Sequence, residues 1–279
     1  RFFQEKGFRS VVSYNGRAFD LPLLETRFVL NRRPLRIAEL PHLDFLFPAR
    51  ILWKHKHDSC RLCHLAREVV QTGRSEDIPS AEIPLRYFEY LRSRDFSLIE
   101  PILYHNQEDI LSLLALVVSG AVLVQRSAAE EWTEEADGMD LYGVGRILER
   151  VKRSRESVRV FQRAVGGRLT SDIAVKTRIK LSQHFKKEGR HGEAVAIWRE
   201  LVSGNRAAGS RELHIYRELA VHYEHQEKNP EEAIRFAEEG LALSRGLSSG
   251  LHEDFSRRLK RLRSKAREAV KERRKRKRP

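Results

Sequence analysis

The stretch YHNQEDILSLL, residues 104–114, opens an apolar run that continues to Val118. Its length and its flanking residues predict a buried helix. His105 and Asp109 stand four residues apart, so both lie on one face of this helix, one turn from each other. A carboxylate at the head of so apolar a helix is costly unless another group compensates it. Two compensations are open: Asn106 as N-cap with Asp109 in the first turn, or a divalent metal ion.

A second stretch, VVSYNGRAFDLPLL at residues 11–24, has the pattern of a strand, a glycine turn and a helix. We expect the strand to cover residues 8–13. The helix is expected to follow at once, because Pro22 suits a first helical turn. Taken alone, Asp20 is expected to be the N-cap of that helix.

Together the two stretches resemble a known family. Asn-x-x-x-Phe-Asp-x-Pro-x-Leu at residues 15–24 and His-Asn-x-x-Asp-x-x-Ser-Leu at residues 105–113 resemble motifs II and III of the DEDD exonucleases. These enzymes belong to the ribonuclease-H-like superfamily, and the resemblance is to its YprB-like branch. It covers residues 1–125 and implies an α/β domain there. In that family each motif supplies one metal-binding aspartate, which implies metal ligands at Asp20 and Asp109.

The resemblance also implies a general base in the third motif. In one subgroup a tyrosine four residues before the last aspartate orients the attacking water, and His105 occupies that position here. Tyr104 stands five residues before Asp109, the spacing at which the other subgroup carries its histidine. We take His105 as the expected general base and Tyr104 as the alternative. Asn15, Tyr104 and Asn106 are expected to contact nucleic acid.

The DEDD family takes two further carboxylates from an Asp-x-Glu on its first strand, ahead of motif II. No aspartate of this sequence is followed by a glutamate two residues later, and only nineteen residues precede Asp20. The resemblance therefore implies an incomplete domain that lacks its first strands. We expect an exposed sheet edge and little nuclease activity from the chain as given.

Composition places the chain among folded two-domain proteins. It has 279 residues, of which 41% are hydrophobic, and only two cysteines, which suits a reducing cytoplasm rather than a disulfide scaffold. No secretory signal is visible, although the sequence starts at Arg1. The run from Ile110 to Val124 is interrupted by polar and small residues, so no membrane span is expected.

The segment HKHDSCRLCH at residues 55–64 carries the Cys-x-x-Cys-His pattern of haem attachment, and with its upstream histidines it could instead bind zinc. The segment runs into a predicted helix over 62–70 and lacks a second paired knuckle. We therefore expect Cys60 and Cys63 to bind neither group. Asp44 is likewise expected to be structural rather than a metal ligand.

The composition changes after residue 125. Residues 126–139 are small and acidic and are predicted to form a linker. Small residues then recur at corresponding places 37 and 39 residues apart, at Ser157, Ala194 and Ala233. This pattern resembles tetratricopeptide repeats and predicts an all-α domain of helix pairs over 140–250, with an irregular helical bundle as the alternative.

Residues 251–279 are predicted to form a capping helix followed by a disordered basic tail. The net charge of the chain is +14, and residues 257–279 alone hold 14 basic and 2 acidic side chains. Such a tail either keeps the protein soluble or contacts phosphate backbones without sequence preference. Three aromatic residues elsewhere could stack on bases, although core packing is expected for at least two of them: Tyr87, Phe88 and Tyr90.

These features predict a metal-dependent nuclease that hydrolyses the phosphodiester bonds of DNA or RNA. The expected substrate is single-stranded nucleic acid. The full-length parent is expected to be a two-metal-ion 3'-5' exonuclease using Mg²⁺ or Mn²⁺, since carboxylates suit these hard cations. The helical repeats are expected to bind a partner protein. The alternative is a non-catalytic interaction protein in which the nuclease-like domain is a degenerate scaffold.

Overall fold

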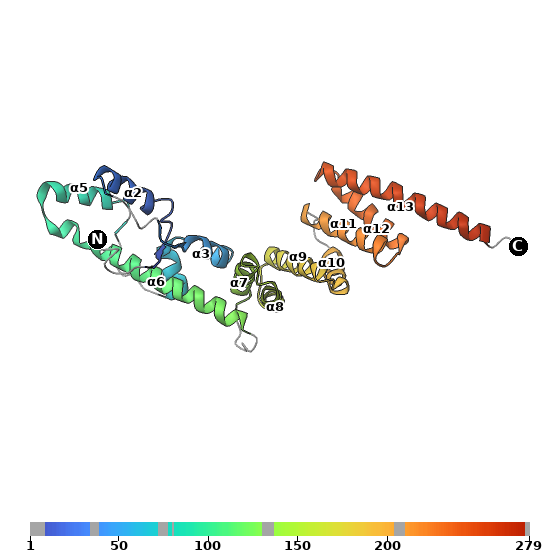
Figure 1. The fold of residues 1–279 in the computed structure, drawn as a ribbon, viewed down its shortest axis with the longest axis horizontal. Helices are drawn as coiled ribbons and strands as arrows, with labels where there is room; N and C mark the ends of the chain where they lie inside the picture. The colour runs from blue at the N-terminus through green and yellow to red at the C-terminus, as the bar shows by residue number, and fades with distance from the viewer. Residues whose placement is uncertain are drawn as a thin grey trace. The chain divides into compact units, whose positions relative to one another are not determined.

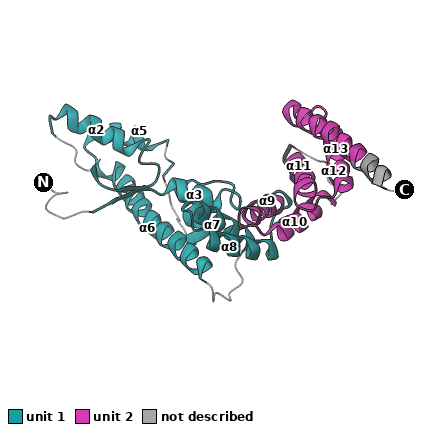
Figure 2. Cartoon of the chain, turned by 45° about the vertical axis from the view of Figure 1, so that its right-hand side comes forward, with its two compact units in different colours: residues 1–173 teal, residues 174–279 magenta. Residues whose placement is uncertain are grey.

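The computed structural model describes residues 9–33, 39–71, 78–79, 81–129, 137–203 and 210–276, with backbone alone at 210–212 and 269–276. The chain forms two compact units, residues 1–173 and 174–279, coloured separately in Figure 2. Each unit is described by itself. The predicted domain boundaries at 125, 139 and 250 stay predictions.

The first unit contains a small parallel sheet. Strand β1 (Val11–Ser13) pairs with β2 (His42–Asp44) in the register Val11 to His42 and Ser13 to Asp44. A parallel pair needs a crossover, and helix α2 (Asp20–Leu30) lies within it. In the described part of the chain the sheet has two strands, so the second edge of β1 has no strand beside it there.

Six further elements continue the first unit, whose longer helices are labelled in Figure 1. They are α3 (Leu46–Trp53), α4 (Leu62–Leu65) with the π-helical turn η2 (Ala66–Val70), α5 (Ile83–Ser93), the 3₁₀ turn η3 (Phe96–Leu98) and α6 (Glu100–Ala128). Helix α5 has no buried residue, and both Tyr87 and Phe88 are exposed. The expectation that two of the three aromatics there pack in a core is therefore wrong.

Helix α6 is buried along one face only. Leu116 and Gly120 lie inside, and a Cβ at Gly120 would meet the Phe45 ring at 2.9 Å, so glycine permits the close approach of α6 to α3 and to Phe45, the N-cap of α3. The opposite face exposes large apolar side chains, including Ile110, Leu111, Leu114 and Val118. The prediction of a helix is confirmed, whereas full burial is wrong.

The stretch Phe96–Ala128, by length and composition alone, could cross a membrane. Ser112, Ser119 and Gly120 do not bring its apolar character below that limit, so the expectation that they would is wrong. The expectation that the chain has no membrane span stays a prediction. The core helix of a folded domain has the same properties, and Leu116 shares one core cluster with Leu52 and Trp53 of α3.

Helices α7 (Gly138–Arg150) and α8 (Ser154–Gly166) complete the first unit. Their Leu141, Val144 and Val160 belong to the same core cluster as α3 and α6. Lys56 donates to Asp140 at 2.5 Å, which ties the start of α7 to the turn after α3. Since α6 extends to Ala128 and α7 begins at Gly138, part of the predicted linker is helical, and residues 130–136 lie outside the described residues.

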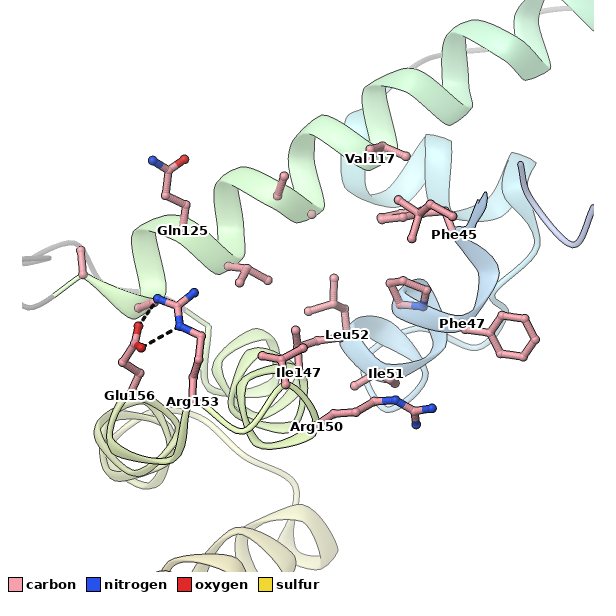
Figure 3. A pocket seen from close by; sticks show the side chains of 18 residues that line it. Phe45, Phe47, Ile51, Leu52, Val117, Gln125, Ile147, Arg150, Arg153 and Glu156 are labelled. Carbon is pink, nitrogen blue, oxygen red and sulfur yellow. Dashed lines mark hydrogen bonds and ion pairs between the residues drawn. The ribbon is translucent and has the colours of Figure 1, made fainter. Parts of the chain in front are cut away.

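An apolar cavity of about 720 Å³ lies between α3, α6 and α7 (Figure 3). Phe45, Leu52, Val117 and Ile147 line it, and the ion pair of Arg153 with Glu156 stands at its rim. Figure 3 shows Gln125, Arg150 and that ion pair as the polar groups beside an otherwise hydrocarbon wall. Such a lining offers no set of ligands for chemistry, so the candidate site lies elsewhere.

The second unit consists of helices that follow one another in pairs. They are α9 (Ser171–Lys187) with α10 (His191–Ser203), α11 (Ser210–His225) with α12 (Pro230–Ser244), and the long α13 (Ser249–Arg276). The small residues at the predicted repeat positions, Ser157 in α8, Ala194 in α10 and Ala233 in α12, are all buried. The predicted helix pairs are therefore confirmed, although helical pairing alone does not identify the repeat family.

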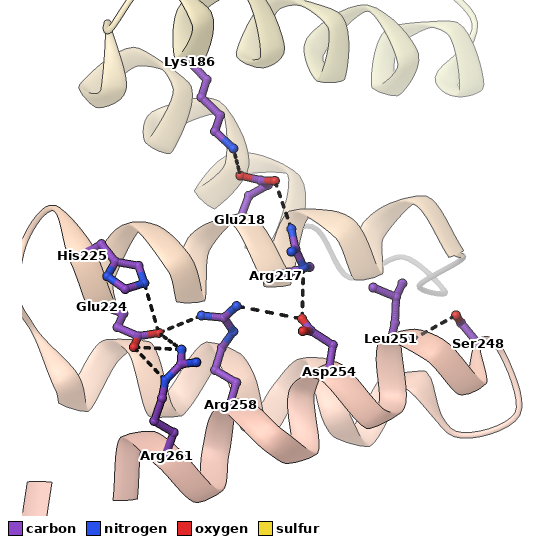
Figure 4. Close-up of polar contacts among 10 residues, drawn as sticks. All are labelled: Lys186, Arg217, Glu218, Glu224, His225, Ser248, Leu251, Asp254, Arg258 and Arg261. Atoms are coloured by element: carbon purple, nitrogen blue, oxygen red, sulfur yellow. Dashed lines mark hydrogen bonds and ion pairs between the residues drawn. The ribbon is translucent and has the colours of Figure 1, made fainter. Parts of the chain in front are cut away.

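Helix α13 covers the last pair by burying Phe255, Leu259 and Leu262. A chain of ion pairs joins α9, α11 and α13 (Figure 4), beginning with Lys186 and Glu218 at 2.5 Å. The burial of these three side chains supports a cap, and the assignment of residues 251–279 as a capping segment stays a prediction. Its helix reaches Arg276, so the expectation of disorder from residue 272 is wrong up to that point, and residues 277–279 lie outside the described residues.

Candidate active site

The first motif lies on the turn that leaves β1. Asn15 has a φ of 65°, in the left-handed region, and the buried Gly16 follows it. A Cβ on Gly16 would collide with the Ser13 side chain and would stand 3.1 Å from Asp20 Oδ2. The glycine is therefore required for the turn to close, and the Asp20 carboxylate lies directly beside it.

Asp44 fixes this turn from the neighbouring strand. Its carboxylate accepts the backbone N–H groups of Asn15 at 2.7 Å, Arg17 at 3.1 Å and Leu46 at 3.3 Å. The residue is only 4% exposed. Because the turn and the start of α3 occupy both carboxylate oxygens, the structural role expected for Asp44 agrees with its contacts.

Asp20 is the first residue of α2 and is exposed. The N-cap of this helix is Phe19, and no side chain makes a capping hydrogen bond. The expectation that Asp20 caps the helix is therefore wrong. Its carboxylate lies beside the Gly16 turn and makes no capping hydrogen bond to the backbone of α2. This placement keeps the carboxylate available to a ligand.

The second motif lies inside α6. His105 Nε2 is 3.5 Å from Asp109 Oδ2, with the two side chains 16% and 37% exposed. The helix begins at Glu100, so the alternative in which Asn106 is the N-cap is wrong. Asn106 is exposed, and Tyr104 is 57% exposed on a different face of the helix from Asp109. Of the two candidate bases, the structure pairs His105 with the motif aspartate.

The described residues do not assemble a complete metal site. Within the ranges that the structure describes there is no group of three or more His, Cys, Asp or Glu side chains that could hold a metal ion. Since His105 and Asp109 are already paired, Asp20 does not join them as a third member. Two divalent ions need more oxygen ligands than Asp20 and Asp109 offer. The residues present fit only part of a two-ion centre, and the assignment of these two ligands stays a prediction.

The cysteine segment contributes no cluster of ligands either, within the described residues. Cys60 is half-buried and Cys63 is exposed, and both are free thiols. Burial raises the pKa of the Cys60 thiol, while the nearby Arg50 and Lys54 oppose this rise. The Tyr14 hydroxyl donates to the Cys60 carbonyl and ties this segment to the turn after β1. The expected absence of zinc and haem stays a prediction.

Sequence analysis missed the polar cavity beside Tyr14. Arg50, Lys54 and Arg61 line it together with Asn15 of the first motif. These cations come from the end of α3 and from the segment before α4. In the sequence these basic residues are spread over twelve positions and form no pattern. They line one cavity because the segment between α3 and α4 folds back beside the turn after β1.

Comparison with known proteins agrees with this architecture. Residues 2–119 match the family model of the RNase_H superfamily, a segment that contains β1, β2 and both motifs. The chain thus has an RNase H-like domain at its N-terminus, with a small parallel sheet, and a mostly helical region after it. The chain is also 32% identical over 267 residues to the protein YprB of Bacillus subtilis (strain 168).

That similarity extends over 95% of this chain and 62% of YprB, so the chain spans less than two thirds of the relative's length. No solved structure matches the chain.

Proposed function

We propose that this chain is part of a metal-dependent nuclease that hydrolyses nucleic-acid phosphodiester bonds. The observation that carries the proposal is that the segment matching the RNase_H superfamily contains both motif aspartates, with His105 beside Asp109. RNase H-like nucleases generally use divalent metals, which activate water and stabilise the leaving oxygen.

Each motif residue has a role in this proposal. Asp20 and Asp109 are metal ligands for Mg²⁺ or Mn²⁺, whose preference for carboxylate oxygens they suit. His105 takes the proton from the attacking water. Asn15 and Asn106 donate to the nucleic acid, and the exposed Tyr104 offers a ring on which a base can stack.

The remaining carboxylates are proposed to come from an Asp-x-Glu outside this sequence. Two observations support this: the described residues lack a third ligand near His105 and Asp109, and the chain spans 62% of YprB. The complete protein is proposed to act as a two-metal-ion 3'-5' exonuclease on single strands. The chain by itself is proposed to be inactive or nearly so, because a two-ion centre that loses essential carboxylates loses most of its catalysis.

A second candidate function is a non-catalytic interaction protein. The absence of a three-ligand group among the described residues favours it. In this case the helix pairs, proposed to be tetratricopeptide-like, bind a partner protein and the RNase H-like domain is scaffold. Both candidate functions share the predicted cytoplasmic location. They differ in whether the protein's function requires the carboxylates of Asp20 and Asp109.

The test compares this chain with a protein extended upstream until it includes an Asp-x-Glu strand. Cleavage of end-labelled single-stranded DNA and RNA is measured with Mn²⁺. We expect the extended protein to cleave and its Asp20→Asn and Asp109→Asn variants to lose activity. Glu108→Gln, one residue from Asp109 on α6, is the matched control and is expected to retain it. A folded extended protein that cleaves neither substrate would favour the interaction protein.

A further inference from the structure

A cavity of about 680 Å³ opens beside the turn that follows β1, and we call it the basic cavity. Its walls are Tyr14 and Asn15 of that turn, Arg50 and Lys54 at the end of α3, and Cys60 and Arg61 before α4. Its volume falls in the range of about 300–1,000 Å³ that small-molecule sites occupy in proteins. The cavity is therefore large enough for a nucleotide-sized group.

The charge of the cavity is positive. Arg50, Lys54 and Arg61 contribute three cations, and Asp58 contributes one carboxylate. Burial and the neighbouring Lys56 lower the pKa of His57, which favours its neutral form at neutral pH. The net formal charge on the lining is thus +2.

The three cations of the basic cavity have no carboxylate partner among the described ion pairs. Other basic side chains of the same unit, such as Arg86 with Glu82 and Arg153 with Glu156, are paired within one helix turn. Cations that line one hollow without a carboxylate partner suit an anion, and the planar guanidinium group matches phosphate oxygens with two parallel hydrogen bonds.

Two lining groups of the cavity, the Tyr14 hydroxyl and the Cys60 thiol, are affected by these cations. Burial raises the pKa of both groups, and the positive charge of Arg50 lowers the pKa of both groups. Lys54 also lowers the pKa of Cys60. The field of both cations therefore reaches the interior of the cavity, where a bound anion would sit.

The cavity adjoins the proposed catalytic residues. Asn15 belongs both to its wall and to the first motif, and the neighbouring Gly16 lies beside the Asp20 carboxylate. Asp44 holds this turn rigid by accepting the Asn15 N–H. A strand held by a phosphate in the basic cavity would accordingly pass beside Asp20.

We propose that the basic cavity is a phosphate-binding site that holds the backbone of a single nucleic-acid strand next to Asp20. Arg50 and Lys54 bind the phosphate oxygens, and Arg61 adds a third positive charge to the lining. The choice of nucleic acid rests on the proposed nuclease function, whereas the affinity for phosphate rests on the cavity alone.

The first experiment measures binding of a short 5'-labelled single-stranded oligonucleotide to the full chain by fluorescence anisotropy across a salt series. The double variant Arg50→Gln/Lys54→Gln is compared with Arg92→Gln/Arg155→Gln, which removes two exposed cations elsewhere in the same unit. We expect the cavity variant to bind about tenfold more weakly at low salt, and its salt slope to fall by about 1.4 for two lost contacts. Equal affinities and slopes for the two double variants would overturn the nucleic-acid assignment.

The second experiment uses the thiol in the cavity wall. Cys63→Ser leaves Cys60 as the single cysteine, since the chain has two. Its alkylation by neutral iodoacetamide is timed alone, with pyrophosphate and with a phosphorylated dinucleotide. We expect both ligands to slow the reaction, and expect no slowing after Arg50→Gln/Lys54→Gln. Circular dichroism confirms that each variant is folded.

The outcomes separate this proposal from the proposed function. Protection of Cys60 in a protein whose extended form cleaves nothing would support the phosphate site and contradict the nuclease. Protection by pyrophosphate but not by the dinucleotide would contradict a nucleic-acid strand as the ligand. No protection by either compound would overturn the phosphate site, whatever the extended protein cleaves.

Discussion

The Asp44 carboxylate, on one strand, accepts the backbone N–H of Asn15, which follows the other strand, at 2.7 Å. This bond sets the turn that carries the first motif, and so couples the pairing of β1 and β2 to the position of Asp20. Two more backbone N–H groups, from Arg17 and Leu46, converge on the same carboxylate.

We predict that Asp44→Ala destabilises the first unit. The substitution leaves three N–H groups without their acceptor in a buried site, and such a loss costs about 1–3 kcal/mol per unsatisfied group. Hydrogen–deuterium exchange should rise over residues 11–20, and the urea midpoint should fall. Asp58→Ala, which removes an exposed carboxylate nearby, is the control. Equal midpoints for the two variants would show that Asp44 does not hold the turn.

A second prediction concerns the buried ion pair of the second unit. Glu224 Oε2 is 2.7 Å from Arg258 Nη1, with side chains 4% and 9% exposed, and Arg261 binds the same carboxylate (Figure 4). Removing one partner of a buried pair typically costs about 3–5 kcal/mol. We expect Glu224→Gln to destabilise the second unit by this order. Glu238→Gln, whose partner Arg263 is exposed, should cost under about 1 kcal/mol.

The effect of Glu224→Gln should depend on pH. Burial raises the pKa of Glu224. The hydrogen bond from Arg261 and the surrounding positive charges lower this pKa by more than burial raises it, so the net shift is downward from 4.5. A lowered folded-state pKa contributes stability above pH 4.5 that is lost as the pH falls through the folded value. Unfolding measured at pH 7 and pH 3.5 should show a smaller difference between wild type and variant at pH 3.5. A difference that grows on acidification would contradict this assignment.

A third prediction concerns the basic end of α13. Residues 269–279 hold seven basic side chains and one acidic side chain. Ending the chain at residue 268 keeps the buried Phe255, Leu259 and Leu262, so the second unit should stay folded. Nucleic-acid affinity should fall and depend less steeply on salt, because fewer counterions are released. An unchanged slope in a folded truncated protein would show that the tail makes no phosphate contacts.

Local patterns in the sequence predicted where helices form better than they predicted which side chains are buried. The helix Asp20–Leu30, the body of α6 and the helix pairs follow from apolar runs, turn residues and the spacing of small residues, which are properties of the chain itself. Burial depends on what packs against an element, so the exposed Phe88 and the exposed outer face of α6 could not be inferred from their apolar residues.

The candidate site shows the same limit. The two motif aspartates were recognisable because each stands within a short pattern, and Asp44 was recognisable as structural because turns favour aspartate. The basic cavity was missed because Arg50 and Arg61 are brought together by the turn between α3 and α4. The start of α6 at Glu100 was missed because the polar residues of the motif resemble a helix cap while they lie inside the helix.

The last prediction distinguishes the two candidate bases in an extended protein that cleaves. His105 Nε2 lies 3.5 Å from Asp109 Oδ2, whereas Tyr104 projects into solvent on another face of α6. A positioned general base contributes about 10²–10⁴-fold to the rate, so His105→Ala should lower kcat by this factor. Tyr104→Phe keeps the ring and removes only the hydroxyl, and should change kcat less than about threefold if the ring serves for stacking.

A loss of folding is separated from a loss of the base by chemical rescue. Added imidazole should restore part of kcat to His105→Gly, because the small base can occupy the space that the side chain leaves. A merely structural histidine would not show this effect. If Tyr104→Phe abolishes cleavage while His105→Ala retains it, the base is Tyr104 and the assignment of His105 is wrong.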